Sequence, residues 1–210
     1  YSITKGCDLL QIEPLMVAVN SDIRELQLTD LRKQLKAAKE KGIKYFIVIA
    51  NMSTTMFGSV DEIEPIVQCL DRENIVFKLH VDAAFGGFIY PFTNPNSKHH
   101  FGNPRVSSIS IDAHKMLQTP YGTGIFLIRK GLMQYVTNTH AQYVPGLDYT
   151  LCGSRSGANA IVIWMLLMNY GSKGWINKMN ELIERTDFTC KRLNQLGINH
   201  YRNPFLNIIT

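Results

Sequence analysis

Two side chains of opposite charge each follow a segment that is expected to be a buried strand. Asp82 comes directly after the mainly apolar residues 76–81 and is followed by Ala, Ala, Phe, Gly and Gly. Lys115 closes the sequence Asp-Ala-His-Lys, which follows a second candidate strand at residues 107–111. If these strands are neighbours in a parallel sheet, their carboxyl ends bring a carboxylate and a primary amine to one edge. The small residues after Asp82 leave room there for a flat molecule.

This pair of groups matches what pyridoxal phosphate (PLP) needs from a protein. Only an amine can tether the cofactor as an imine, and the lysine must be partly desolvated to be nucleophilic. A buried carboxylate keeps the pyridine nitrogen protonated, so that the ring can accept electrons. We therefore predict that Lys115 forms the Schiff base and Asp82 binds the ring nitrogen. Ala84 would let the ring approach the backbone, and His114 would contact the phosphate or the imine.

Apolar periodicity predicts an alternation of strands and helices around these residues. Strands are expected at residues 45–50, 76–81, 107–111 and 124–128, and helices at 29–41, from Asp61 onward, at 156–170 and at 173–196. Asp61 is expected to cap its helix, and residues 207–210 have the pattern of a strand that has just begun. This alternation predicts an α/β fold with a largely parallel sheet and flanking helices.

Several segments also resemble one known family, the group II PLP-dependent amino-acid decarboxylases, which include glutamate, histidine, tyrosine and aromatic amino-acid decarboxylases. The matching segments follow the family's order and cover most of the chain; they are residues 1–6, 53–55 with Gly58 and Asp61, 80–84, 110–115 and 153–157. The resemblance implies the aminotransferase-like architecture of fold type I. It also implies the PLP-dependent decarboxylation of a small-molecule L-amino acid to the amine and carbon dioxide.

The resemblance also implies how the chain divides into domains and that it forms an oligomer. Residues 1–170 would form part of the large PLP-binding domain, and residues 171–210 would form the connecting helix and the start of the small C-terminal domain. Members of the family are homodimers with active sites between the subunits, so a homodimer is expected. The apolar residues 161–168 would contribute to that contact.

Position by position, the resemblance implies roles in cofactor binding. Lys115 and Asp82 keep the roles deduced above, and Ala84 would lie under the ring. Thr55 would lie near the cofactor's phenolic oxygen or the substrate carboxylate. His114 would lie near the phosphate.

The family's mobile catalytic loop and the Gly-Ser-Arg segment after it imply two further roles. A tyrosine of this loop protonates the substrate carbon after carbon dioxide leaves, and the corresponding stretch here holds Tyr143 and Tyr149. Of the two, Tyr143 is favoured as the catalytic residue. Arg155 would bind a carboxylate or phosphate of the substrate, or contact a neighbouring subunit.

Some features depart from the family pattern. Ser53 stands where the family usually has a glycine, so the backbone of that turn is expected to differ. The family has a ring-stacking histidine directly before its first matching segment, whereas this sequence begins at Tyr1. Residues 204–210 resemble only the beginning of the small C-terminal domain. By this comparison, the chain is expected to be truncated at both ends.

Composition indicates which classes of partner and which cell compartment to expect. The formal net charge is +5, but the basic residues are spread along the chain, which argues against nucleic acid and suits a site for anions. The cysteines lack the paired spacing of a zinc site, and no metal is expected. The longest apolar run, 161–168, is far shorter than the ~20 residues of a membrane span. A cytoplasmic protein without membrane association is expected.

Two other functions remain open at this point. The first is carbon–carbon lyase chemistry of the sphingosine-phosphate lyase type, which a phosphorylated substrate would reveal. The second is an inactive, truncated paralogue that acts as a partner subunit. Among the histidines, His80 is expected to be buried with its hydrogen bonds satisfied, and His99 and His100 are expected in a solvated loop rather than at a metal.

Overall fold

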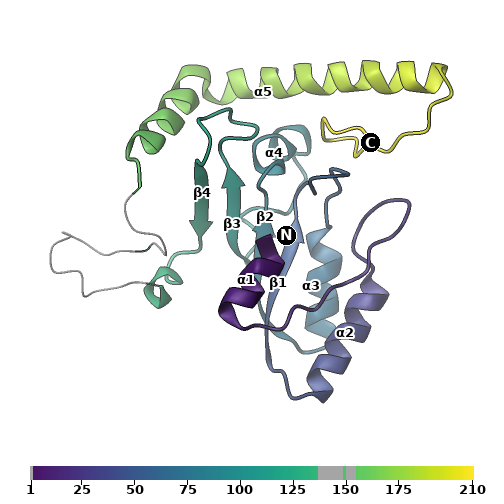
Figure 1. The fold of residues 1–210 in the computed structure, drawn as a ribbon, viewed down its shortest axis with the longest axis vertical. Coiled ribbons are helices and arrows are strands. Elements are labelled where there is room, and N and C mark those ends of the chain that lie inside the picture. The colour runs from purple at the N-terminus through teal and green to yellow at the C-terminus, as the bar shows by residue number, and fades with distance from the viewer. Residues whose placement is uncertain (1, 137–148, 150–154) are drawn as a thin grey trace.

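A four-stranded sheet lies at the centre of the structure, a computed structural model that describes residues 2–136, 149 and 155–210 (Figure 1). The elements in chain order are α1 (Ser2–Leu10), α2 (Leu28–Glu40), β1 (Tyr45–Asn51), α3 (Ile63–Arg72), β2 (Val76–Asp82), η1 (Gly86–Phe88), α4 (Tyr90–Thr93), β3 (Val106–Asp112), β4 (Gly124–Ile128), η2 (Met133–Tyr135) and α5 (Ala158–Gln195). The α/β fold expected from the sequence is confirmed.

The strands have the order β1-β2-β3-β4. β1 pairs with β2 and β2 with β3 in parallel, whereas β4 runs antiparallel to β3. All four strands were predicted within one or two residues of their ends, because each is a short apolar or alternating run bounded by turn residues. The carboxyl ends of β1, β2 and β3 therefore meet at one edge of the sheet.

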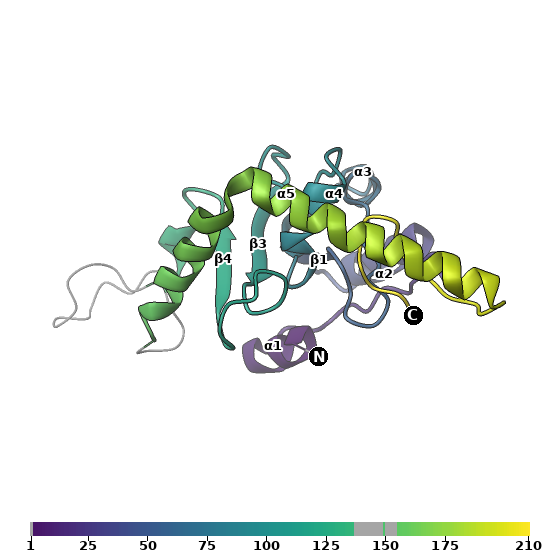
Figure 2. The same ribbon diagram turned by 90° about the horizontal axis from the view of Figure 1, so that it is seen from above.

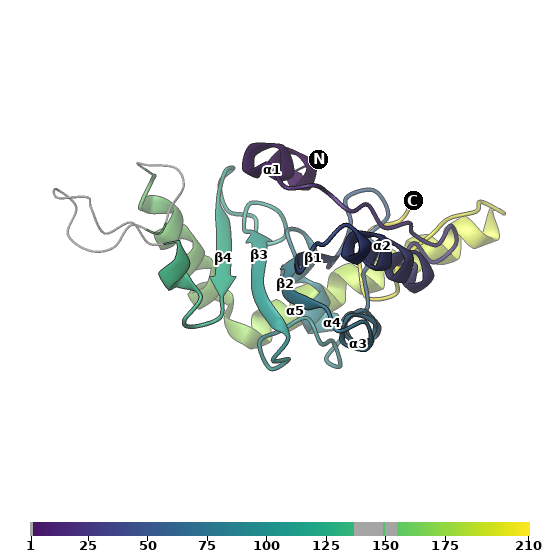
Figure 3. The ribbon, with the colours of Figure 1, turned by 90° about the horizontal axis from the view of Figure 1, so that it is seen from below.

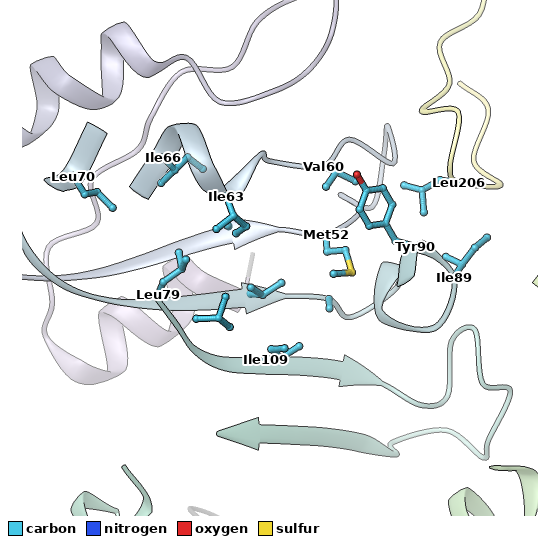
Figure 4. Packing of buried hydrophobic residues seen from close by; sticks show 14 of the residues in the cluster. Met52, Val60, Ile63, Ile66, Leu70, Leu79, Ile89, Tyr90, Ile109 and Leu206 are labelled. Atoms are coloured by element: carbon cyan, nitrogen blue, oxygen red, sulfur yellow. The ribbon is translucent and has the colours of Figure 1, made fainter. Parts of the chain in front are cut away.

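One face of the sheet is covered by helices. In Figures 2 and 3, α3, α4 and α5 lie on one side of the strands and α1 lies on the other. Figure 4 shows side chains of α3 packed over the strands on the covered side. Buried apolar side chains fill this interface and continue toward the C-terminal segment. They are Ile63, Ile66, Leu70, Leu79, Ile109 and Leu206, each at most 7% exposed.

Helix α5 extends over the top of the sheet and contains a break (Figure 1). Gly171 has φ 56° and ψ 179°, which are not helical values, so two helical stretches meet there as the sequence indicated. The second stretch packs on the covered side: Trp175 meets Phe88 with ring centroids 5.6 Å apart, and Met179 is buried.

The opposite face of the sheet is largely uncovered. Helix α1 lies on this side but buries none of its residues. Strand alternation and the register place Tyr45 and Ile47 of β1 beside Val76 of β2 on this face. These three side chains are 77%, 64% and 60% exposed, and Phe126 of β4 is 59% exposed.

Two structural expectations were wrong. Asp61 does not cap α3; the N-cap residue is Glu62, which makes no capping bond with its side chain. The buried Asp61 carboxylate accepts hydrogen bonds from the backbone and side-chain nitrogens of Asn51 (2.9 and 2.8 Å) and from the backbone of Leu26 (3.2 Å). Tertiary donors therefore outcompete the local cap. Residues 207–210 form no strand; Thr210 exchanges two backbone hydrogen bonds with Tyr201.

The expectation for His99 was also wrong. Its side chain is 4% exposed rather than solvated. Nε2 lies 2.8 Å from the carbonyl oxygen of Asp61, Nδ1 lies 2.9 Å from Ser97 Oγ, and the ring packs edge-on against Tyr90. The histidine thus joins two loops, which the polar sequence around it does not reveal. Among the described residues, we find no helix with the length and apolar content that a membrane span requires.

Candidate active site

The carboxyl ends of β2 and β3 are held together by their backbones. Asp82 is opposite Ser110 in the register of the two strands. The Ala83 N–H donates to Ser110 O (2.9 Å), and the Asp112 N–H donates to Ala84 O (3.0 Å). The segment after Asp82 and the turn that carries Lys115 are therefore adjacent, as the sequence predicted.

The Asp82 carboxylate has a fixed orientation. Its Oδ1 accepts a hydrogen bond from the backbone N–H of Ala84 (3.1 Å), which forms a turn directly after the strand. Its other oxygen accepts no hydrogen bond from the residues that the structure describes. Asp82 is half-buried and can therefore accept one further strong donor.

The small residues after Asp82 allow a close backbone approach. A Cβ at Gly86 would collide with the carbonyl group of Met52, and a Cβ at Gly87 would lie 2.8 Å from Ile111 Cγ1. These glycines thus pack the segment against Met52, which follows β1, and against β3, rather than leaving space for a ligand. Ala84 is not fully buried, so a ligand could still contact it.

Lys115 lies in the turn that follows β3. Its backbone N–H donates to Asp112 O (3.0 Å), and its Nζ lies 2.8 Å from Asp112 Oδ2. The side chain of Lys115 is 37% exposed, so its amine is accessible. The lysine therefore pairs with a carboxylate of its own turn.

His114 occupies the same turn. Its Nδ1 lies 2.9 Å from the carbonyl oxygen of Thr123, which can only accept, so Nδ1 carries a proton. Nε2 lies 4.0 Å from Asp112 Oδ2, and the side chain is 22% exposed. The ring is thereby oriented by Thr123 with Nε2 free to meet an anion if it is protonated.

His80 is satisfied within the sheet, as expected. Nδ1 and Nε2 lie 2.8 and 3.1 Å from the hydroxyl oxygens of Ser108 and Ser110, and the ring stacks on Phe126. Burial lowers the pKa of His80 below its ordinary value of 6.5, and the charge of Asp82 offsets this only in part. The lowered pKa favours the neutral form of His80, which the two serines hold on the same face of the sheet as Asp82.

The turn after β1 keeps the backbone of a glycine although it carries a serine. Ser53 has φ 78°, in the left-handed region, and is 8% exposed. Its Oγ finds no hydrogen-bond partner among the described residues. Ser53 thus adopts a conformation that usually favours glycine. Thr55 is exposed in the same turn, which is closed by bonds between Thr54 and Ser59.

Three further residues, Tyr143, Tyr149 and Arg155, were considered from the family resemblance. Tyr143 lies outside the described residues. Tyr149 is 44% exposed, and Arg155 is exposed shortly before α5 begins.

Sequence reasoning missed the contribution of Asp112. The residue was part of the motif at 110–115, but no role was assigned to it. Its position three residues before Lys115, at the start of a turn, was the signal that could have indicated the contact.

The residues present fit PLP. The cofactor needs an amine for attachment and a carboxylate for its ring nitrogen. Lys115 and Asp82 supply these groups from one edge of the sheet, and Asp82 retains an oxygen that can accept a hydrogen bond. No three His, Cys, Asp or Glu side chains gather in a group that could bind a metal ion in the part of the chain that the structure describes.

The fold and this pair of groups define the class of PLP-dependent α/β proteins. Residues 1–200 match the family model described as the pyridoxal-dependent decarboxylase conserved domain. The chain therefore belongs to the pyridoxal-dependent decarboxylase family, which confirms the resemblance seen in the sequence.

Relatives and solved structures agree with this assignment. The chain is 51% identical over its whole length to a tryptophan decarboxylase of Clostridium sporogenes and 30% identical to a histidine decarboxylase of Vibrio anguillarum, of which it covers 50% and 53%. It spans about half the length of these curated relatives. The crystal structure of L-methionine decarboxylase from Streptomyces sp. 590 is similar in fold, with a TM-score of 0.81 and 18% identity over 100% of this chain and 57% of that one.

Proposed function

We propose that this chain forms part of a PLP-dependent amino-acid decarboxylase, a carboxy-lyase whose cofactor is attached to Lys115. The observation that carries the proposal is that Asp82 ends β2 and Lys115 lies in the turn after the adjacent parallel strand β3. The backbone N–H groups of Ala83 and Asp112 donate across to Ser110 and Ala84 and hold the two strand ends together. Membership of the decarboxylase family supports the same reaction.

Each residue near the strand ends has a proposed part in holding the cofactor. Bound PLP would supply the electron sink that stabilises the carbanion left by the departing carbon dioxide. Asp82, oriented by the Ala84 N–H, would keep a proton on the ring nitrogen. Ala84 would lie under the ring. His114 would bind the phosphate, and Thr55 would meet the phenolic oxygen or the substrate carboxylate.

Two residues have proposed roles toward the substrate. Tyr143 would deliver the proton to the carbon that has lost its carboxylate, and Arg155 would bind an anionic group of the amino acid. Both assignments rest on the order of the family's sequence segments. The exposure of Arg155 is compatible with contact to a ligand or to a second subunit.

The wider organisation is also a proposal. Residues 1–170 would belong to the large PLP-binding domain and residues 171–210 to the connecting helix and the start of the small domain, with the division at the break at Gly171. A homodimer would form partly through α5, where Ile161 and Trp164 are 59% and 61% exposed. Reduced thiols at Cys7, Cys69 and Cys190 suit a protein of the cytoplasm.

The substrate is proposed from the relative with 51% identity, which is named a tryptophan decarboxylase. L-Tryptophan is therefore the first amino acid to assay for release of carbon dioxide, followed by the other aromatic amino acids and L-histidine. Release of carbon dioxide with formation of the matching amine would support the proposal. Cleavage of a phosphorylated amino alcohol, without decarboxylation, would indicate the carbon–carbon lyase alternative instead.

The attachment of the cofactor is tested by trapping. PLP is added to the purified protein, the imine is reduced with borohydride, and the labelled peptide is identified by mass spectrometry. We expect the label on Lys115 and its loss in Lys115→Ala. The control is Lys130→Ala, because this exposed lysine follows the antiparallel β4 and lies at the other end of the sheet. Unselective labelling, or equal labelling of Lys115→Ala, contradicts the proposal and would indicate the inactive paralogue.

A further inference from the structure

The carboxylate of Asp112 lies beside the amine of Lys115, and the backbone that carries it is fixed by the sheet. Asp112 is the last residue of β3, and its backbone N–H donates to Ala84 O (3.0 Å) while its own carbonyl oxygen accepts the Lys115 N–H (3.0 Å). On its other side it is opposite Gly124 of β4. The strands and the turn therefore fix the point from which the carboxylate reaches Lys115 Nζ at 2.8 Å.

This ion pair is placed where it contributes little to the stability of the fold. The side chains are 34% and 37% exposed, and ion pairs that water can reach are screened and contribute weakly. A lysine, however, is long and flexible, and a fixed partner restricts the positions that its amine adopts. The main effect of the pair is thus on where the amine lies.

His114, the other basic side chain of the turn, does not compete for this carboxylate while its ring is neutral. The proton on His114 is at Nδ1, which faces the Thr123 carbonyl (2.9 Å). Nε2, 4.0 Å from Asp112 Oδ2, is then without a proton and cannot donate. With His114 neutral, the Asp112 carboxylate has Lys115 as its cationic partner within the described turn.

We propose that Asp112 is a positioning residue that holds the Lys115 amine beside the segment following Asp82, ready for attachment of the cofactor. The inference rests on the proposed function, because it concerns the lysine assigned there. On attachment, the Lys115 ammonium loses one proton to solvent and its nitrogen bonds to the carbon of the cofactor's aldehyde. The aldehyde oxygen leaves as water with the two remaining hydrogens of the amine. The carboxylate takes no part in these bond changes except to place the nitrogen.

Asp112→Asn removes the charged partner that places the amine. Attachment at Lys115 should therefore become slower and spread over other lysines. Asn has the same shape as Asp, and the two backbone hydrogen bonds of residue 112 do not need the side chain.

The experiment measures how fast and how selectively PLP labels Lys115. The purified protein is mixed with limiting PLP, samples are reduced with borohydride over time, and labelled peptides are quantified by mass spectrometry. We expect Asp112→Asn to lower the rate at Lys115 by about tenfold, a modest share of what orientation can contribute. Asp112→Glu, which keeps the charge, should recover most of the selectivity. Asp22→Asn removes an exposed carboxylate elsewhere and serves as the charge control.

A second measurement covers the case in which Asp112→Asn does not fold, as judged by thermal unfolding. High salt screens a half-exposed ion pair, so it should reduce the fraction of label on Lys115 of the unaltered protein. The proposal is overturned if selectivity is unchanged by salt, if Asp112→Asn labels Lys115 as fast and as selectively as the unaltered protein, or if Asp112→Glu behaves like Asp112→Asn. If the unaltered protein does not label Lys115 at all, the proposed function itself fails.

Discussion

At the scale of single residues, the site combines local and distant contacts. Asp82 is oriented by its own turn, through the Ala84 N–H, whereas its neighbour on the sheet face, His80, is held by two serines of another strand. Asp112 and Lys115 meet within one turn. The groups proposed to bind the cofactor therefore keep their places by short, local bonds, and the sheet keeps the two turns together.

Ser53 gives a prediction at this scale. A residue with a Cβ in the left-handed region is strained by roughly 1–2 kcal/mol, and the buried Ser53 hydroxyl is unpartnered among the described residues. We expect Ser53→Gly to raise the free energy of unfolding by about 1 kcal/mol, after the extra flexibility of glycine in the unfolded chain is subtracted. Urea unfolding measures this change.

A matched variant separates the two causes. Ser53→Ala removes the hydroxyl but keeps the strained backbone, so it should be less stable than Ser53→Gly. If Ser53→Gly were instead destabilising, the hydroxyl would have to make a contact that outweighs the strain.

At the scale of elements, the break in α5 depends on one glycine. The values of φ 56° and ψ 179° at Gly171 are accessible almost only to glycine, and other residues pay on the order of 1–3 kcal/mol in such regions. The break lets the second stretch turn so that Trp175 and Met179 reach the covered side of the sheet.

We therefore expect Gly171→Ala to lower the free energy of unfolding by roughly 1–3 kcal/mol. Gly157→Ala is the matched control, because Gly157 has φ −64° and a Cβ there would meet open space. Chemical denaturation followed by circular dichroism compares the two variants. Equal stability of Gly171→Ala and Gly157→Ala would show that the break does not need a glycine.

At the scale of the whole molecule, one face of the sheet is largely uncovered. Parallel strands are normally covered on both faces. Here Tyr45, Ile47, Val76 and Phe126 are all at least 59% exposed on one side. A surface of this kind promotes association in water, because contact removes apolar area from solvent.

We expect the chain of these 210 residues to self-associate, and Ile47→Lys to weaken that association. Met56→Lys is the control: Met56 is 69% exposed but lies in the turn after β1, not in a strand. Sedimentation velocity at several concentrations measures the effect. A chain that stays monomeric at all concentrations, or an equal effect of both variants, would show that this face does not drive association.

The sequence by itself determined the strands, the main helices and the pair Asp82 and Lys115. Strands and helices follow from local apolar periodicity, and in a parallel sheet the ends of neighbouring strands meet at one edge. The break near Gly171 was visible for the same reason, since a glycine interrupts a helical pattern.

Only the tertiary structure decided what Asp61, His99 and Ser53 do. The Asp61 carboxylate accepts hydrogen bonds from Leu26 and Asn51, which belong to other elements. His99 is buried, and its ring nitrogen contacts the carbonyl oxygen of Asp61. The left-handed backbone of Ser53 is forced on a residue that does not prefer it. Such choices follow from the free energy of packing the whole chain, which can override local preference at a single residue.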